Sequence, residues 1–450
     1  MKLNTKRTVL VGFAFLSICA FWQMYDNIIP LILTNTFHLD ETISGAIMAA
    51  DNVLALFLLP FFGALSDRTS TKIGRRMPFI LGGTAAAVIL MNLLPLFDNG
   101  YANGASTGKL AMFVVTLGLL LVAMGTYRSP AVALMPDVTP KPLRSKANAV
   151  INLMGSAGGI IVLALGMVFA TASVSNSMMS YTGYFGVIAA LMLAALVVFM
   201  LTVREPEWAK EMQAQSVAAG VENAEEAAHP NEGRKLSADE VKSLLLILLS
   251  IVLWFFGYNA VTSKYSVYAS NILHKDYNLT LIIAQAAAIA AYLPVGFIAG
   301  KIGRKKTILA GVVMLTVAFG VAGFLTADSP SALMNAMFAL AGIAWATINV
   351  NSFPMVVELA SGGDVGKYTG FYYTASMAAQ VATPMVSGLL MDKFGMHVLF
   401  PYAALFVALS FVTMCFVKHG DSREMPKQTA AAGTEDAGAI DNTVEELTND

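Results

Sequence analysis

The sequence predicts an all-α membrane protein in which twelve transmembrane helices form two pseudo-symmetric six-helix bundles. Of its 450 residues, 56% are hydrophobic and only 13% are charged, whereas soluble domains carry about 25% charged residues. Twelve apolar runs of about 20 residues follow one another, and a run of this length can cross a bilayer as a helix. In addition, motifs of the first half return in the second half.

The twelve runs divide into a first bundle at 1–203 and a second bundle at 243–418. Their approximate limits are 8–33, 43–66, 78–97, 109–136, 148–171, 182–203, 243–272, 279–300, 306–326, 333–357, 368–390 and 398–417. Basic residues precede the first run, as in a signal peptide, but no small-x-small cleavage site follows before Asp26, so we expect a retained helix. Segment 204–242 is predicted to be a cytoplasmic linker with a short surface helix around Pro206–Gln215. Segment 419–450 is predicted to be a disordered cytoplasmic tail.

The distribution of cations predicts the orientation of the chain. If both termini lie in the cytoplasm, all 28 Lys and Arg residues except five fall on the cytoplasmic side. The five exceptions are Lys109, Arg128, Lys264, Lys275 and Lys393. The opposite orientation would violate the rule that positive loops stay inside. We expect a monomeric, multi-pass protein of the cell inner (cytoplasmic) membrane, and the net charge of −1 argues against a nucleic-acid partner.

One charged loop separates the second and third apolar runs and reads GALSDRTSTKIGRR over residues 63–76. A loop with so many cations is expected at the cytoplasmic face. Its first glycine lets two helices approach closely, its second permits a tight turn, and its aspartate is placed to pair with a nearby cation. The loop is either a topology anchor or, in the interpretation that we favour, a conformational latch. The predicted latch residues are Gly63, Asp67, Arg68, Gly74, Arg75 and Arg76, together with Asp137 and Glu358 at the inner ends of the fourth and tenth runs.

The loop pattern Gly-x3-Asp-Arg…Gly-Arg-Arg resembles the cytoplasmic loop motif of the major facilitator superfamily. Its long spacer, Thr69–Ile73, and the Met-Pro-Phe-Ile that follows are similar to the sucrose-transporter branch and the glycoside–pentoside–hexuronide branch. The resemblance covers about residues 1–420 apart from the linker. It implies a secondary transporter in which helices 1, 4, 7 and 10 line a central cavity and the two halves rock about it.

The second half repeats the loop between its own second and third apolar runs, as Gly296-x3-Gly300-Lys-Ile-Gly-Arg-Lys-Lys. Asp137 and Glu358 each precede a lysine by nine residues in their respective halves. Their common order supports a duplicated six-plus-six architecture. Because Gly300 occupies the place of Asp67, we expect the second loop to supply no equivalent restraint.

Four charged residues lie within the predicted helices: Asp26, Asp51, Arg128 and Lys264. Charges at bilayer depth are costly, so they mark functional sites or pairs that hold helices together. The two acids and two bases balance, and ion pairs among them could keep all four charged. For proton coupling, Asp26 is the first candidate for the proton-carrying group and Asp51 is the second.

Amide and aromatic side chains gather on the same helices. Amides suit the recognition of hydroxyl groups and aromatic rings stack on the C–H faces of sugars, although such side chains also serve packing between helices. The predicted substrate-binding residues are Gln23, Asp26, Asn27, Tyr127, Arg128, Tyr258, Asn259, Lys264, Trp345 and Asn349.

The family resemblance is weaker at the binding residues than at the loop. Against the sucrose-transporter pattern, an arginine of the fourth helix is replaced by Val132 and a membrane-embedded aspartate by Leu121. Against the melibiose-permease pattern, two cation-binding aspartates fall on Ala55 and Leu59, and a sugar-binding aspartate falls on Arg128. A sodium site of that kind is therefore not expected.

The sequence holds no pattern typical of catalysis or metal binding. Its five histidines are scattered, its two cysteines lack metal-site spacing, and it has no Gly-Lys-Ser/Thr phosphate loop. We expect no enzyme activity, no catalytic residues, no cofactor and no metal. The predicted function is proton-coupled uptake of a sugar, a di- or oligosaccharide glycoside, by alternating access, with the sugar, protons and the lipid bilayer as partners. The alternatives are transport of an anionic organic solute and, in another class, a non-transporting membrane sensor.

Overall fold

The computed structural model describes residues 2–39, 41–169, 171, 179–220, 236–273, 278–360 and 364–421, and these residues form helices joined by short turns. The first group of helices is α1 (Thr5–Leu31), α2 (Glu41–Arg68), α3 (Met77–Ala102), α4 (Thr107–Asp137), α5 (Arg144–Val168) and α6 (Thr182–Thr202). A shorter helix, α7 (Glu205–Ala218), follows. The second group is α9 (Ala238–Tyr268), α10 (Asn278–Ile302), α11 (Arg304–Ala322), α12 (Ser331–Val357), α13 (Val365–Phe394) and α14 (Leu399–Cys415).

Eleven helices in the described part of the chain are long and apolar enough to cross a membrane. The remaining one of the twelve predicted helices is α13, which is just as long at 30 residues. Its first half is rich in Gly, Thr, Tyr and Ser, which lowers its hydropathy, and it packs against α2 and α9. The predicted all-α membrane fold is therefore confirmed.

Most of the observed helices are longer than the predicted apolar runs, whereas α6, α11 and α14 are shorter. Polar residues such as Asp98 continue α3 as far as Ala102, and α9 begins with the polar turn at Ala238. The surface helix predicted in the linker is α7, which begins at Glu205. The rest of the linker between 221 and 235, and the predicted tail from 422 onward, lie outside the described residues.

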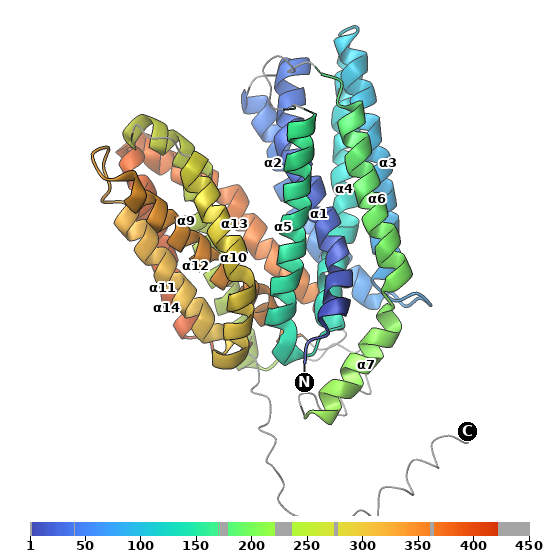
Figure 1. Cartoon of the computed structure of the whole chain (residues 1–450), viewed down its shortest axis with the longest axis vertical. Coiled ribbons are helices and arrows are strands. Elements are labelled where there is room, and N and C mark those ends of the chain that lie inside the picture. Colours follow the sequence, from blue (N-terminus) through green and yellow to red (C-terminus); the bar gives the residue numbers. More distant parts are fainter. Residues whose placement is uncertain are drawn as a thin grey trace, which may run out of the picture.

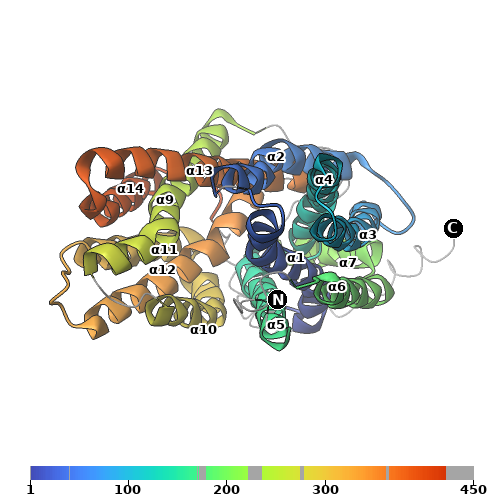
Figure 2. The ribbon, with the colours of Figure 1, turned by 90° about the horizontal axis from the view of Figure 1, so that it is seen from above.

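The two groups of helices lie side by side, with α1–α6 on one side and α9–α14 on the other (Figure 1; Figure 2). The N-terminus and α7 lie at one end of the molecule, where the two groups are closest together in Figure 1. We call this the linker end. Contacts between the groups are made mainly by α2 with α13 and by α5 with α10. In the sequence repeat, α2 of the first group corresponds to α10 of the second, and α5 corresponds to α13. The two contacts are therefore equivalent.

Glycines allow the backbones of α2 and α13 to touch near the linker end. A Cβ atom on Gly63 would collide with the carbonyl oxygen of Gly366, and a Cβ on Gly366 would collide with that of Gly63. One turn further along, Gly370 faces the backbone of Pro60 in the same way. Small residues are the usual means by which membrane helices approach this closely.

Candidate functional site

An arginine on α4 is the centre of a charged cluster where the two groups meet. The guanidinium carbon of Arg128 lies 5.1 Å from the ring centre of Trp22 on α1 and 5.0 Å from that of Tyr373 on α13. At this distance the negative face of an aromatic ring attracts a cation. Because Tyr373 belongs to the second group, Arg128 connects the two groups directly.

Two carboxylates act on Arg128. Asp26 on α1 and Asp51 on α2 both interact electrostatically with its charge, and Asp51 also acts on Asp26. Asp26 is exposed, whereas Asp51 is half-buried and its Oδ1 atom forms no hydrogen bond with any residue that the structure describes. When both carboxylates are ionised, the three groups carry a net charge of −1, and one bound proton neutralises it.

Four of the five positions at which the sequence departs from the family patterns lie at this cluster. Ala55, Leu59 and Leu121 line a small cavity together with Asp51 and Arg128. Asp51 precedes Ala55 by one helical turn, so it faces the same side of α2. Asp51 therefore places a carboxylate on the side of α2 that faces Arg128.

The second group contributes aromatic and amide side chains. Tyr258 of α9 stacks on Trp345 of α12, with ring centres 3.7 Å apart and planes within 6° of parallel. The Nδ2 atom of the neighbouring Asn259 is buried and has no hydrogen-bond partner among the described residues. Buried polar atoms of proteins are nearly always paired, so an unpaired amide beside an aromatic pair is typical of a binding site. The carbonyl of Asn349, on the same helix as Trp345, accepts a hydrogen bond of 3.3 Å from Asn148 of α5.

Of the predicted binding residues, Asp26 and Arg128 belong to the cluster, whereas Tyr127 and Lys264 lie apart from it. Tyr127 is fully buried and, with Ser17 and Phe199, lines a separate small cavity inside the first group, because adjacent positions of a helix point in different directions. Lys264 is half-buried in α9 and is not one of the charges that act on Asp26, which are those of Asp51 and Arg128. Among the described residues, the structure brings together Asp26, Asp51 and Arg128, while no ion pair joins Lys264 to them. Gln23 and Asn27 lie on the same helix as Asp26; Gln23 packs beside Gly159 of α5, and Asn27 is exposed.

The sequence interpretation missed tyrosines on α13 and α10. Tyr373 faces Arg128, while the hydroxyl of Tyr372 lies 3.4 Å from that of Ser352 on α12. Arg128 and Tyr292 of α10 both lie within electrostatic range of Tyr372. The family resemblance placed only helices 1, 4, 7 and 10 at the cavity, so these positions were not considered. The available signal was the run Phe-Tyr-Tyr-Thr in a helix of low hydropathy.

At the linker end, Asp67 joins the first group to the second. Its carboxylate accepts hydrogen bonds of 2.9 Å from the backbone N–H of Gly366 and 2.8 Å from that of Lys367, in the first turn of α13. The same carboxylate accepts a 2.5 Å bond from Nη2 of Arg76. A helix N-terminus is a natural site for an anion, so the predicted latch acid holds both a cation of its own loop and a helix of the other group.

Arg76 organises the rest of this loop. It is fully buried, and its Nε donates to Asp137 at 2.8 Å, while Arg75 donates to the other oxygen of Asp137 at 2.7 Å. Gly74 has a φ angle of +120°, which explains why a glycine is needed at this turn. Arg68 is exposed and lines a groove between α2 and α13.

The second loop also joins the two groups, contrary to expectation. Arg304 is fully buried, donates from Nη1 to Glu358 at 2.7 Å, and reaches the first group through Ser145 at 3.0 Å and the carbonyl of Lys141. In return, Arg144 donates to the carbonyl of Val357 at 3.0 Å. The expectation that Gly300 leaves this half without a restraint is therefore wrong, because arginines bound to carbonyl groups replace the missing acid.

The sequence analysis did not identify two further acidic residues that bind the loops. Glu205, the first residue of α7, accepts hydrogen bonds from the backbone N–H groups of Arg75 at 2.9 Å, Arg76 at 3.0 Å and Met77 at 3.2 Å. Asp421 accepts from the N–H groups of Arg304 at 2.6 Å and Lys305 at 3.3 Å. Each acid follows the last apolar run of its half and caps the third helix of that half, which was the only signal in the sequence.

Replacing Glu205 with glutamine should loosen the first loop. Burial raises the pKa of Glu205 and Asp137 adds to this effect, whereas Arg76 and the N–H donors oppose it. Loss of the charge-assisted bonds should lower the stability of the folded protein by about 1–3 kcal/mol, seen as a lower melting temperature in detergent. Glu207→Gln, on the exposed face of the same helix, is the matched control. Equal melting temperatures for the two variants would show that the cap contributes nothing.

Comparison with known proteins gives one family. The chain matches the family model described as Major Facilitator Superfamily over residues 11–292 and 268–443. It is 32% identical over 145 residues to a sucrose transport protein of Arabidopsis thaliana, an alignment that covers 29% of this chain and 24% of that protein. It is 26% identical over 180 residues to YagG of Escherichia coli (strain K12), whose name describes a glycoside/cation symporter, with 40% and 38% covered. These alignments span well under half the length of each relative.

Solved structures share the fold across nearly the whole chain. The proton:xylose symporter XylE bound to 6-bromo-6-deoxy-D-glucose superposes with a TM-score of 0.66 at 15% identity, covering 94% of this chain and 96% of that one. A structure of the E. coli fucose:proton symporter FucP gives a TM-score of 0.67 at 13% identity, covering 92% and 98%. The human organic anion transporter MFSD10 gives 0.66 at 15% identity, covering 92% and 100%. At such identities the likeness extends to the fold alone.

Proposed function

Since this chain belongs to the major facilitator superfamily, we propose that it is a proton-coupled transporter that takes up a sugar, a di- or oligosaccharide glycoside, by alternating access. The observation that carries this proposal is the cluster in which Asp26 and Asp51 lie within electrostatic range of Arg128, which also contacts the second group. The cluster can bind one proton, and Arg128 contacts both groups of helices. Binding of that proton can therefore change how the two groups are held together. The sucrose and glycoside names of the relatives support the substrate class.

We place the linker end in the cytoplasm, in a bacterial-type inner membrane with both termini inside. The positive loops at residues 63–76 and 296–306 support this orientation. In that orientation the structure is closed toward the cytoplasm, because both loops bind the opposite group there. Exposure of Asp26 then corresponds to access from the outside. We propose that the protein works as a monomer whose two six-helix bundles, 1–203 and 243–418, move as units.

In the proposed cycle, Asp26 takes up a proton from the outside while the cytoplasmic end is closed. Neutralising one carboxylate weakens its hold on Arg128, which frees the guanidinium to donate to sugar hydroxyls. The amides of Gln23, Asn27, Asn259 and Asn349 supply further hydrogen bonds, and the stacked pair of Tyr258 and Trp345 offers an aromatic surface to a sugar ring. A substrate that touches residues of both groups would draw the outer ends together and release the cytoplasmic end.

The anionic-solute alternative is favoured by Arg128 and Lys264, two cations within predicted membrane spans. A thermal-shift screen of the purified protein against sugars and organic acids distinguishes the two functions, followed by counterflow in proteoliposomes with the best ligand of each class. We expect stabilisation and counterflow with a neutral glycoside such as sucrose. If only carboxylated solutes give counterflow, the protein transports an anionic solute and not a sugar.

Replacing Arg128 with lysine should weaken sugar binding about tenfold, because lysine keeps the charge but loses the planar fork and the contacts with Trp22 and Tyr373. Arg128→Gln should weaken it at least as much. Binding is measured by titrating the purified protein with the best sugar of the screen, and Arg204→Gln on the surface serves as the control. Wild-type affinity in both Arg128 variants would leave this residue with a role in helix packing only.

A further inference from the structure

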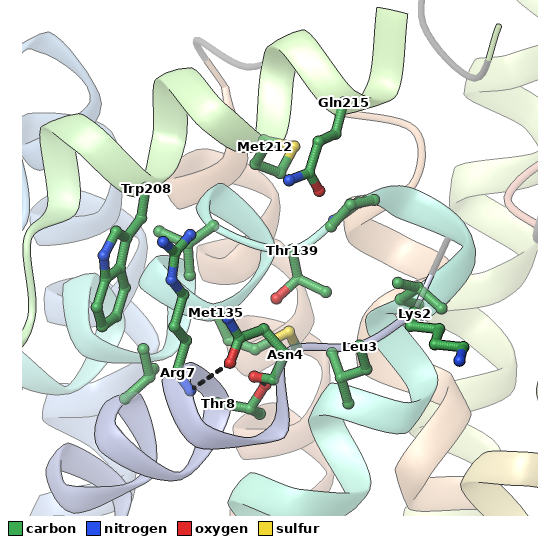
Figure 3. A pocket seen from close by; sticks show the side chains of 14 residues that line it. Lys2, Leu3, Asn4, Arg7, Thr8, Met135, Thr139, Trp208, Met212 and Gln215 are labelled. Atoms are coloured by element: carbon green, nitrogen blue, oxygen red, sulfur yellow. Dashed lines mark hydrogen bonds between the residues drawn. The ribbon is translucent and has the colours of Figure 1, made fainter. Parts of the chain in front are cut away.

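A cavity of about 190 Å³ lies at the linker end, apart from the charged cluster. Four segments enclose it: the N-terminal residues 2–4, the start of α1, the turn between α4 and α5, and α7 (Figure 3). Its walls are held in place by Arg7, which donates to Glu211 of α7 at 2.5 Å and lies 5.0 Å from the ring centre of Trp208. The cavity is therefore built by the linker helix against the first group of helices.

Apolar side chains form more than half of the lining of this cavity, and its polar members suit a small, hydroxylated anion. Thr139 and Gln215 point into the space between α7 and α1, and Lys2 lies at its edge (Figure 3). The described lining residues include two cations, Lys2 and Arg7, and no carboxylate. Arg7 already pairs with Glu211, whereas Lys2 is exposed at the edge of the cavity and is the cation that can reach a ligand from the solvent side. The volume lies below the ~300 Å³ at which pockets for drug-sized molecules begin, so the occupant is about the size of one sugar ring.

Both walls of the cavity belong to the closure between the two groups. The carbonyl of Thr139 accepts a hydrogen bond of 3.3 Å from Arg144, and Arg144 in turn donates to the carbonyl of Val357 on α12. On the other side, α7 begins with Glu205, which accepts a hydrogen bond from the backbone N–H of Arg76, and the side chain of Arg76 binds Asp67, which in turn binds the first turn of α13. A molecule that bridges Thr139 and α7 would therefore stabilise the arrangement in which the linker end is closed.

We propose that this cavity is a regulatory site for a phosphorylated polyol of about one sugar ring, and that its occupancy holds the linker end closed. The phosphate pairs with Lys2, and the hydroxyl groups bind Thr139 and Gln215. A ligand that prefers the closed state must shift the conformational equilibrium toward it. Accumulation of phosphorylated sugars in the cytoplasm would then slow further uptake. The site is separate from the proposed substrate site and does not depend on which solute is transported.

Binding is tested on the full-length protein in phosphatidylcholine nanodiscs, with glucose 6-phosphate as the probe. We expect saturable binding that is at least tenfold tighter than that of glucose or inorganic phosphate. Lys2→Gln and Gln215→Leu should each weaken it about tenfold, whereas Lys210→Gln, on the exposed face of α7, should leave it unchanged. Nanodiscs that contain phosphatidylglycerol distinguish a soluble sugar phosphate from a lipid headgroup as the molecule that supplies the phosphate and hydroxyl groups. Loss of glucose 6-phosphate binding in these discs would identify a lipid headgroup as the natural occupant of the same site.

The effect on conformation is read from fluorophores on Ser70→Cys and Lys306→Cys, one in each group, with Cys19 and Cys415 replaced. Glucose 6-phosphate should raise the ratio of closed to open linker ends about fivefold, and Gln215→Leu should remove this effect. The inference is overturned if neither glucose 6-phosphate nor phosphatidylglycerol binds, if the Lys2 and Gln215 variants bind as the wild type does, or if binding leaves the distance distribution unchanged.

Discussion

Replacing Asp26 with asparagine should abolish sugar accumulation driven by a pH gradient, while exchange of sugar across the membrane stays measurable. Of the two carboxylates within electrostatic range of Arg128, Asp26 is the exposed one, so it is the one that can exchange protons with the outside. Asparagine has nearly the same shape but cannot release a proton. The site should then remain in its protonated arrangement, which binds and exchanges sugar but cannot use the gradient.

The measurement is uptake of labelled sugar into proteoliposomes, with and without an imposed pH gradient. Asp51→Asn should reduce gradient-driven uptake less than Asp26→Asn, because Asp51 is half-buried. Asp328→Asn, in an exposed turn, controls for the loss of a carboxylate as such. Accumulation by Asp26→Asn at the level of the wild type would remove Asp26 from the coupling mechanism.

Replacing Asp67 with asparagine should shift the protein toward the state that is open at the linker end. Asp67 makes charge-assisted hydrogen bonds to Arg76 and to the first turn of α13. Removing its charge leaves the fully buried Arg76 with one carboxylate partner fewer. Loss of such a buried pair amounts to about 1–3 kcal/mol, or roughly a 5- to 150-fold change in the equilibrium. Uptake should slow, while the sugar affinity of each state stays nearly unchanged.

The shift is measured with fluorophores at Ser70→Cys and Lys306→Cys, with Asp364→Asn as a neighbouring control that breaks no bond to Arg76. Glu358→Gln tests the second loop in the same way, because Arg304 depends on that carboxylate. If Asp67→Asn leaves the distances unchanged and Glu358→Gln alters them, the closure is maintained by the second loop alone.

The fold and the latch loop could be predicted because they depend on local features of the chain. Helix positions follow from apolar length, and the need for a glycine at position 74 follows from the turn between two helices. The pairing of Asp67 with a cation of its own loop could likewise be predicted, because Arg76 is only nine residues away in the sequence.

The contacts between the two groups could not be predicted. The partner of Asp67 on α13 is 299 residues away, and the sequence repeat suggested instead that only one loop would restrain the molecule. Arg128 and Tyr127 are neighbours in sequence, but the direction of each side chain depends on how α4 is rotated against α1 and α13. The rings that enclose Arg128 come from two helices, only one of which the family resemblance placed at the cavity.

The most direct test of proton-coupled sugar uptake is to follow both solutes in one experiment. Proteoliposomes are loaded with a pH-sensitive dye, and the best sugar of the thermal-shift screen is added outside without an imposed pH gradient. Entry of sugar through the wild-type protein should acidify the interior, and Asp26→Asn should let sugar equilibrate with no change in internal pH. Sugar entry through the wild type without acidification, or equal acidification with Asp26→Asn, would contradict a proton carried on Asp26.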